Sequence, residues 1–239
     1  MGRINFKKGT ALAPTPPTMV TVGDEKESNV LTVGWVGIMA TQPPTTYISV
    51  RPERHSYEIL KRTGEFVINL PPASLAHTVD YVGIYTGAKV DKFEKCSLTK
   101  VASEHVKAPT IKECPIAIEC RVKQILPMGT HDVFIADILG FSCDESIVGA
   151  DGRIMYDRAD LMAYAHGEYF ALGESLGKFG FGTKPVSEKP KLKPTAKAKE
   201  KPAAAEEKTK TEPFYKSLPR KMLKNTGKGG KKKCKARKT

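Results

Sequence analysis

The chain has 239 residues, of which 40% are hydrophobic, 27% charged and 8% aromatic. This composition is typical of a globular protein and leaves room for one sizeable domain with an appended segment. The longest nearly apolar run, VGWVGIMA, is far too short to span a bilayer. We therefore expect no membrane segment and a cytoplasmic location.

The net charge of +13 is concentrated at the C-terminal end of the chain. Residues 184–239 contain 20 Lys and Arg against 5 Asp and Glu, whereas residues 1–183 contain 19 against 21. The segment 184–239 is rich in Lys, Pro, Ala and Thr, and its few apolar residues cannot offset the entropy of ordering. We predict a neutral domain over residues 10–183 and a disordered basic tail. The tail either binds nucleic acid or another acidic surface, or is a solvated extension.

Several kinds of site have no signature in the sequence. The five cysteines form no C-x-x-C pair and have no histidine at metal-ligand spacing, so no metal site or disulfide framework is expected. They are interpreted as reduced thiols, which suits the cytoplasm. Neither G-x-x-x-x-G-K-[ST] nor G-x-G-x-x-G occurs, which excludes a P-loop and a Rossmann nucleotide site.

Strand-like segments dominate the first 145 residues. They are rich in Val, Ile and Thr, and turn-forming residues separate them. The expected strands cover residues 18–23, 29–40, 46–51, 65–71, 116–126 and 131–141, with a hairpin turn at PMGT before the last. Six strands at short spacing favour a mainly β fold, built as a closed or partly closed antiparallel barrel.

Short helices are expected between the strands. Over residues 56–63, Ser56 is a candidate N-cap and Gly64 follows the last turn. Over residues 73–85, apolar side chains recur about once per helical turn. The stretch 159–173 predicts a short helix followed by an extended segment.

The basic stretch SVRPERHSYEIL has the ingredients of a phosphate site. A strand ends at Arg51, and a helix begins near Ser56 with free backbone N–H groups that favour an anion. Arg51 and Arg54 add charge-assisted donors, and Ser56 adds a hydroxyl. The alternative is that both arginines are solvated and that Ser56 only caps the helix.

Two further residues have ambiguous roles. His131 follows a turn and is a candidate general acid or ligand-facing donor, with a plain surface histidine as the alternative. Trp35, the only tryptophan, suits the core better than a cofactor wall on composition alone.

Four spaced motifs together resemble the flavin reductase-like proteins of the FMN-binding split-barrel superfamily, closest to the flavoredoxin-type branch. They are SNVLTVGWVGIMATQPPTTYISVRPERHSYEILKRTGEFVINLP, VDYVGIYTGAKVDKF, APTIKECPIAIEC and GTHDVFIADI, and GEYFALGESLGKFGFG is similar to the C-terminal signature of that branch. The resemblance covers residues 10–183. It implies a six-stranded antiparallel split barrel with flanking short helices, which binds FMN, usually as a homodimer.

The flavin-holding segments of the family map onto one set of positions in this chain. They are Asn29, Thr32, Gly34, Trp35, Ser49, Val50, Arg51, Arg54, Ser56, Asn69, Leu70, Pro71, Thr86, Gly87 and Lys92. His131 resembles the histidine that approaches the flavin or the nicotinamide in related reductases, and is the candidate catalytic residue. Val82 and Thr86 stand where this branch often has Cys and Ser, so a thiol near the flavin is absent while a hydroxyl remains.

The resemblance implies an oxidoreductase that passes a hydride or electrons from NADH or NADPH through bound FMN to a flavin, a metal complex or a protein. An electron-transfer flavoprotein that does not use nicotinamide is the alternative within the same fold. A binder of nucleic acid or acidic surfaces, acting through the tail, is the alternative from another class.

Overall fold

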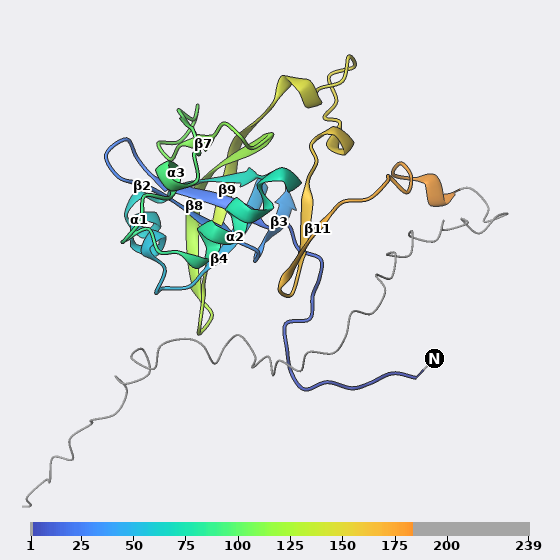
Figure 1. Cartoon of the computed structure of the whole chain (residues 1–239), viewed down its shortest axis with the longest axis horizontal. Coiled ribbons are helices and arrows are strands. Elements are labelled where there is room, and N and C mark those ends of the chain that lie inside the picture. Colours follow the sequence, from blue (N-terminus) through green and yellow to red (C-terminus); the bar gives the residue numbers. More distant parts are fainter. Residues whose placement is uncertain (1, 184–239) are drawn as a thin grey trace, which may run out of the picture. The chain divides into compact units, whose positions relative to one another are not determined.

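The computed structural model describes residues 2–183, which form one antiparallel sheet with short helices packed around it (Figure 1). The sheet has seven strands in the order β2-β1-β5-β8-β9-β4-β3. Its strands are β1 (Thr18–Gly23), β2 (Ser28–Val33), β3 (Val36–Thr41), β4 (Pro44–Val50), β5 (Glu65–Leu70), β8 (Ile116–Pro127) and β9 (Asp132–Cys143). The predicted mainly β fold is confirmed, with seven strands in place of six.

Helices and two small sheets surround this main sheet. The α-helices are α1 (His55–Thr63), α2 (Ala76–Ile84) and α3 (Lys92–Lys95), and the 3-10 helices are η1 (Ala73–Leu75), η2 (Glu145–Ile147), η3 (Tyr156–Arg158) and η4 (Phe181–Thr183). The small sheets pair β6 (Lys100–Val101) with β7 (Thr110–Ile111), and β10 (Met162–Ala165) with β11 (Glu168–Ala171). The predicted helices near residues 56–63 and 73–85 and the hairpin turn before β9 are all present.

The single strand expected over residues 29–40 is wrong, because the chain turns a corner at Gly34 and Trp35. Residues up to Val33 pair with β1, whereas residues from Val36 onward pair with β4. An uninterrupted apolar run carries no local sign of this change of partner. The consequence is that β2 and β3, the two edges of the sheet, follow one another directly in the chain.

The helix expected at the start of residues 159–173 is also wrong, because this stretch is the β10–β11 hairpin. Its two turn residues, His166 and Gly167, have positive φ values of 43° and 109°. Two consecutive residues with positive φ match the twist of a tight hairpin. The His-Gly pair was therefore the turn signal in the sequence.

Helix α1 begins one residue earlier than expected, and Ser56 is not its cap. Arg54 is the N-cap residue, without a side-chain capping bond, and Ser56 is buried within the first turn. The Ser56 hydroxyl instead accepts a hydrogen bond from Nδ2 of Asn29, at 2.8 Å. At the other end Gly64 adopts the left-handed conformation with φ 67°, as the sequence predicted.

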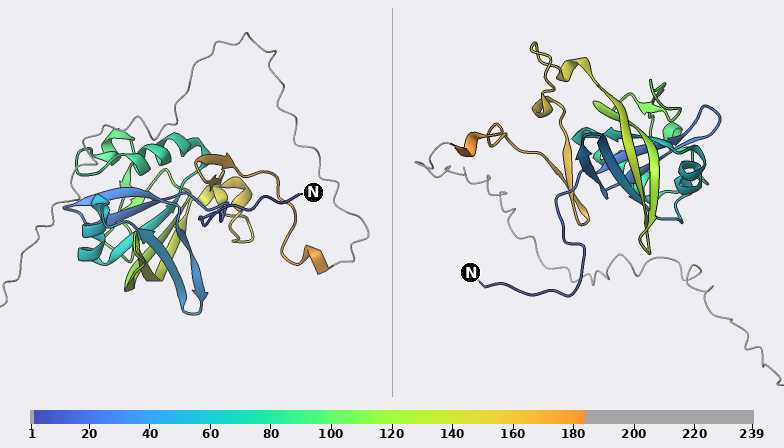
Figure 2. Two further views of the ribbon diagram at one scale, coloured as in Figure 1. Left: turned by 90° about the horizontal axis from the view of Figure 1, so that it is seen from below. Right: turned by 180° about the vertical axis from the view of Figure 1, so that it is seen from behind.

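The core has two main parts, on the two faces of the sheet. The barrel interior is filled from the strands and from the apolar face of α1, including Tyr57, Ile59 and Leu60. A second cluster lies between the outer face of β1 and β2 and the helices α2 and α3, with Val79 and Val82 at its centre (Figure 2). Helix α2 is thereby fixed against β2, which also forms part of the site described below.

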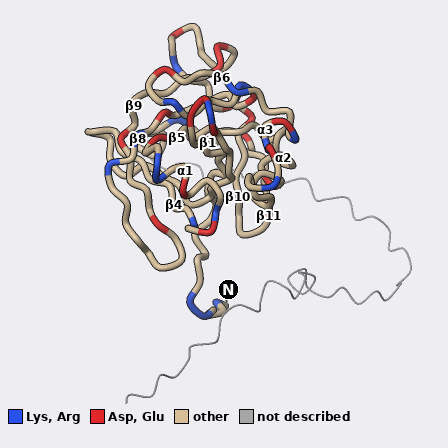
Figure 3. The backbone as a smooth tube through the Cα atoms, turned by 90° about the vertical axis from the view of Figure 1, so that its left-hand side faces the viewer, with Lys and Arg blue, Asp and Glu red and all other residues tan. Residues whose placement is uncertain are grey.

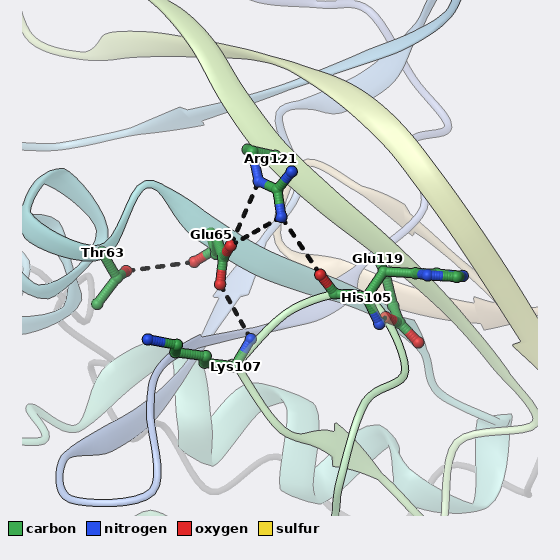
Figure 4. Close-up of polar contacts among 6 residues, drawn as sticks. All are labelled: Thr63, Glu65, His105, Lys107, Glu119 and Arg121. Atoms are coloured by element: carbon green, nitrogen blue, oxygen red, sulfur yellow. Dashed lines mark hydrogen bonds and ion pairs between the residues drawn. The ribbon is translucent and has the colours of Figure 1, made fainter.

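The segment between β6 and β7 is irregular and is held by carboxylates (Figure 4). Buried Glu119 accepts hydrogen bonds from the backbone N–H groups of residues 104 and 105. Glu65 accepts one from the N–H of Lys107, at 3.0 Å, and pairs with Arg121. These bonds replace the ladder that the segment lacks.

Charged positions are mixed over the described part of the chain (Figure 3). Basic and acidic residues are interspersed there, as the near-neutral balance of residues 1–183 predicts. The predicted basic tail, residues 184–239, lies outside the described residues. The expected homodimer and tail partners stay predictions.

Two expected absences can be compared with residues 2–183 only. Within this range no helix is both long and apolar enough to cross a membrane. The four cysteines of the same range, Cys96, Cys114, Cys120 and Cys143, are free thiols.

Asn69 lies in the core, where all its hydrogen-bonding groups are used. Its Nδ2 donates to the carbonyl oxygen of Met19 at 3.0 Å, and its Oδ1 accepts from the N–H of Ile111 at 2.9 Å. The side chain is fully buried. Asn69 therefore ties β5 to β1 and to the loop that ends at β7.

We predict that Asn69→Leu lowers the free energy of unfolding by about 1–3 kcal/mol, because the N–H of Ile111 loses its buried acceptor. Urea denaturation monitored by circular dichroism measures this change. The exposed strand substitution Gln124→Leu serves as the control and should leave the stability within about 0.5 kcal/mol of the wild type. Equal stabilities of the two variants would contradict the structural role of Asn69.

Candidate functional site

A first cavity of about 310 Å³ opens where the β2–β3 corner faces α2 and the β10–β11 hairpin. This volume lies at the lower end of the range for small-molecule sites. Its lining comes from six parts of the chain: Pro17, Leu31, Thr32, Val33, Gly34, Trp35, Ser49, Val50, Arg51, Arg54, Asp80, Gly83, Ile84, His131, Tyr164 and Tyr169. One wall is aromatic and one end is basic.

Close packing of α2 on β2 shapes this cavity. The Thr32 hydroxyl donates to the carbonyl oxygen of Val79, and a Cβ on Gly83 would lie 3.2 Å from the Cβ of Thr32. Glycine at position 83 therefore allows the close approach. Its carbonyl oxygen accepts a hydrogen bond of 2.8 Å from Nη1 of Arg54, which fixes the arginine at the cavity rim.

A second, smaller cavity of about 80 Å³ adjoins the first and shares Leu31 and Arg54 with it. It lies between the start of α1, the turn after α2 and helix α3, and is lined by Asn29, Leu31, Glu53, Arg54, His55, Ser56, Tyr85, Thr86, Gly87 and Lys92. A Cβ on Gly87 would overlap the side chain of Asn29 at 2.4 Å, so only glycine fits there. The second cavity is polar and basic, and its size suits a small anion.

Lys92 is the most unusual group of the second cavity. Its side chain is 4% exposed, and its Nζ donates to the carbonyl oxygens of Val30 and Val82, at 2.8 Å each. None of the ion pairs among residues 2–183 includes Lys92. Burial, and secondly the charge of Arg54, lower the pKa of Lys92 to about 8. Glu53, the one acidic residue that lines this cavity, lies against Arg51, so the neighbouring cations Lys92 and Arg54 favour an added anion.

Arg51 and Arg54 differ in their surroundings. Arg51 is exposed and lies 3.8 Å from Glu53, a contact that water screens strongly. Arg54 borders both cavities and is the N-cap residue of α1, whose nine residues present free N–H groups at this end. The phosphate-binding stretch predicted from the sequence is thus brought to the junction of the two cavities.

His131 lines the first cavity at the start of β9. Its Nδ1 lies 2.9 Å from the hydroxyl of Thr130. Next to it, Asp132 accepts a hydrogen bond from the Tyr57 hydroxyl of α1, so the histidine turn and the helix are linked. Burial, and then the charge of Arg51, lower the pKa of His131 below its ordinary value. The imidazole is therefore neutral at pH 7 and can donate one hydrogen bond.

The structure brings twelve of the fifteen mapped cofactor-binding positions and His131 to the two cavities. Asn69, Leu70 and Pro71 line neither cavity. Asn69 is used within the core, as described above, and Leu70 packs against the apolar clusters on both sides of β5. Ser56 reaches the second cavity from within α1, not as its cap.

Three polar or aromatic residues of the first cavity were not expected from the sequence. Asp80 lies on α2, and Tyr164 and Tyr169 lie on the β10–β11 hairpin. The hydroxyl of Tyr169 donates to Oδ1 of Asp80, at 3.2 Å. Recognising the hairpin turn at His166 and Gly167 would have placed both tyrosines on one side of it.

No group of three or more His, Cys, Asp or Glu side chains within residues 2–183 has the arrangement of a metal site. The two cavities are lined instead by single acidic and histidine side chains next to arginine, lysine and aromatic side chains.

Comparison with known proteins places this site in a recognisable family. Residues 10–173 match the model of the flavin reductase like domain. An uncharacterized protein of Archaeoglobus fulgidus is 33% identical over 164 residues, which are 69% of this chain and 91% of that protein. The structure of flavoredoxin from Desulfovibrio vulgaris (Miyazaki F) superposes with a TM-score of 0.72 at 33% identity, covering 77% of this chain and 100% of the flavoredoxin.

A more distant relative is a named enzyme. The NADH-dependent FMN reductase AsuE2 of Streptomyces nodosus subsp. asukaensis is 25% identical over 142 residues, which are 57% of this chain and 73% of that enzyme.

We predict that His131 titrates below its ordinary pKa of 6.5 in the protein without ligands. Titration of the imidazole signals by NMR, assigned with His131→Gln, measures this value. Arg51→Met should move the pKa of His131 upward, because the larger of the two arginine charges that lower it is removed. A value at or above 6.5 in the wild type would contradict the burial of the ring.

Proposed function

We propose that this chain, which belongs to the flavin reductase-like family, is a flavoprotein oxidoreductase that binds FMN with its phosphate in the second cavity and its ring system in the first. The observation that favours this assignment most is the buried ammonium group of Lys92, which forms no ion pair with a carboxylate of residues 2–183. A phosphate carries roughly two negative charges and three acceptor oxygens. It would neutralise Lys92 and Arg54 together and accept from the hydroxyl of Thr86.

The protein groups of the first cavity suit a planar polar ring. Trp35 and Tyr164 supply aromatic surface, and His131 supplies a neutral hydrogen-bond donor. When bound, FMN supplies hydride and single-electron chemistry. The protein then has to bind, orient and shield the reactants, which explains why the site needs no acid-base triad.

The electron donor is proposed as NADH or NADPH. The NADH-dependent activity of AsuE2 favours a nicotinamide donor. The likeness to flavoredoxin favours an electron carrier as the second candidate. Hydride transfer requires the two reacting atoms about 3–3.5 Å apart in stacked rings. The aromatic wall of the first cavity is the surface against which a second ring can lie.

We predict that anaerobic mixing of the FMN-loaded protein with NADH or NADPH bleaches the visible absorption band of the flavin. Stopped-flow absorbance measures the rate, and dithionite gives the endpoint of full reduction. If neither nucleotide bleaches the band while a reduced ferredoxin does, the protein is an electron carrier and not a reductase.

We predict that Lys92→Met weakens FMN binding at least about tenfold, because a charge-assisted contact with the phosphate is lost. Riboflavin has no phosphate, so its affinity should stay within about twofold of the wild type. Isothermal titration of the flavin-free protein measures both affinities. Lys95→Met, on the exposed side of the same helix, is the matched control and should change neither.

The pH dependence gives the same assignment a second test. Because Lys92 loses its proton near pH 8 in the free protein, FMN affinity should fall as the pH rises above that value. Riboflavin affinity should not follow this fall. Equal losses for both flavins in Lys92→Met, or at high pH, would contradict a phosphate in the second cavity.

A further inference from the structure

The β10–β11 hairpin forms one wall of the first cavity but is not part of the barrel. It is a separate two-stranded sheet that follows β9 by a long irregular stretch (Figures 1 and 2). Tyr164 on β10 and Tyr169 on β11 line the cavity. Their ring centroids lie 5.3 Å apart and their planes are tilted by 55°, so the two rings contact each other at an angle.

The base of the hairpin is firmly attached. Met162 is buried in the cluster beneath α2, and the N–H of Ala73 donates to the carbonyl oxygen of Asp160 at 2.6 Å. Tyr164 and Thr15 exchange two backbone hydrogen bonds, of 2.9 and 2.8 Å. These contacts fix β10 to the rest of the domain, and β11 pairs with β10 alone.

Side-chain contacts tie the rest of the hairpin to the cavity lining. The Tyr169 side chain packs against the cluster beneath α2, and its hydroxyl donates to Asp80 of α2 at 3.2 Å. The ring of His166 at the tip lies 6.2 Å from the ring of Trp35 at the β2–β3 corner. Burial, and then the charge of Asp80, raise the pKa of Tyr169 to about 12, so its hydroxyl stays a donor.

The hairpin and the β2–β3 corner therefore supply the aromatic side chains of the first cavity. Tyr164 and Tyr169 come from the hairpin and Trp35 from the corner. Aromatic rings pack best against other flat rings, in offset or edge contacts. A bulky, non-planar molecule would have to displace the hairpin, whereas a flat one would not.

We propose that Tyr169, through its bond to Asp80, is a specificity-determining residue that holds the hairpin so that the first cavity admits planar aromatic reaction partners and excludes bulky non-planar ones. This inference rests on the proposed function, because it concerns what reaches the same site. It goes beyond that function because it names the class of electron acceptor and the part of the fold that selects it. The class is flat ring systems such as quinones, as opposed to chelated metal ions.

The first test does not require flavin. Trp35 is the only tryptophan of the chain, so tryptophan fluorescence reports on its surroundings, which include the hairpin tip. In the flavin-free protein, Tyr169→Phe should raise acrylamide quenching of Trp35 about twofold or more, because the hairpin loses the hydrogen bond that ties it to α2. Asp80→Ala should act like Tyr169→Phe, whereas Asp80→Asn, which keeps an acceptor oxygen, should resemble the wild type. Tyr156→Phe, an exposed tyrosine outside the cavity, is the matched control.

The second test measures selection between acceptors, with NADH or NADPH as the electron source. Menadione takes up two electrons and two protons to form its hydroquinone, and ferric EDTA takes up one electron to form ferrous EDTA. Tyr169→Phe should lower the ratio of the menadione rate to the ferric EDTA rate about fivefold, because the larger acceptor gains access. The Tyr156→Phe control should keep the ratio of the wild type.

The outcomes separate this inference from the proposed function. Unchanged quenching in both Tyr169→Phe and Asp80→Ala overturns the role of the hydrogen bond, whether or not FMN binds. Increased quenching with an unchanged rate ratio overturns the role in specificity. Failure of the wild type to bind FMN would refute the proposed function while the quenching result still reports on the hairpin.

Discussion

The barrel depends on one constraint: its two edge strands are consecutive in the chain. Strands β2 and β3 lie at opposite ends of the hydrogen-bonded order, yet only Gly34 and Trp35 separate them. The sheet must therefore roll until its edges meet. At the meeting point the N–H of Ser49 donates to the carbonyl oxygen of Trp35 at 2.9 Å, and the first cavity opens beside it. The corner that closes the barrel therefore also forms part of the lining of the first cavity.

The two cavities are electrostatically different although they share a wall. The first is largely aromatic and holds the neutral His131, while the second concentrates Arg54 and buried Lys92 around a space that fits a small anion. A ligand that is flat at one end and doubly negative at the other would satisfy both at once. The basic groups at the cavities are the buried Lys92 and the exposed Arg51 and Arg54, in a domain that is near neutral as a whole.

Local pattern in the sequence was enough for most strands, for both longer helices and for the Gly64 helix end. It was not enough for the corner at Trp35, because an apolar run looks the same whether or not the strand changes partner. Ser56 was predicted as a cap because capping is a local rule, but its actual partner, Asn29, is distant in sequence. The burial of Lys92 could not be seen either, since α3 is only four residues long.

Most of the mapped family positions lie where segments converge on the two cavities, whereas Asn69 lies elsewhere and its amide serves the core. Asp80 and Tyr169 were missed for a related reason: they meet across 89 positions of sequence. Such contacts follow from the packing of α2 against the hairpin, which no pattern within either element contains.

The independence of the β10–β11 hairpin also bears on how such a protein can diversify. Since this hairpin shares no ladder with the barrel strands, its length and tip can change without breaking a strand pair of the barrel. In the proposed assignment the phosphate end of the site lies on α1, α3 and β2, away from this hairpin. A change in the ten residues from Met162 to Ala171 would then alter the wall of the first cavity and leave the lining of the second as it is.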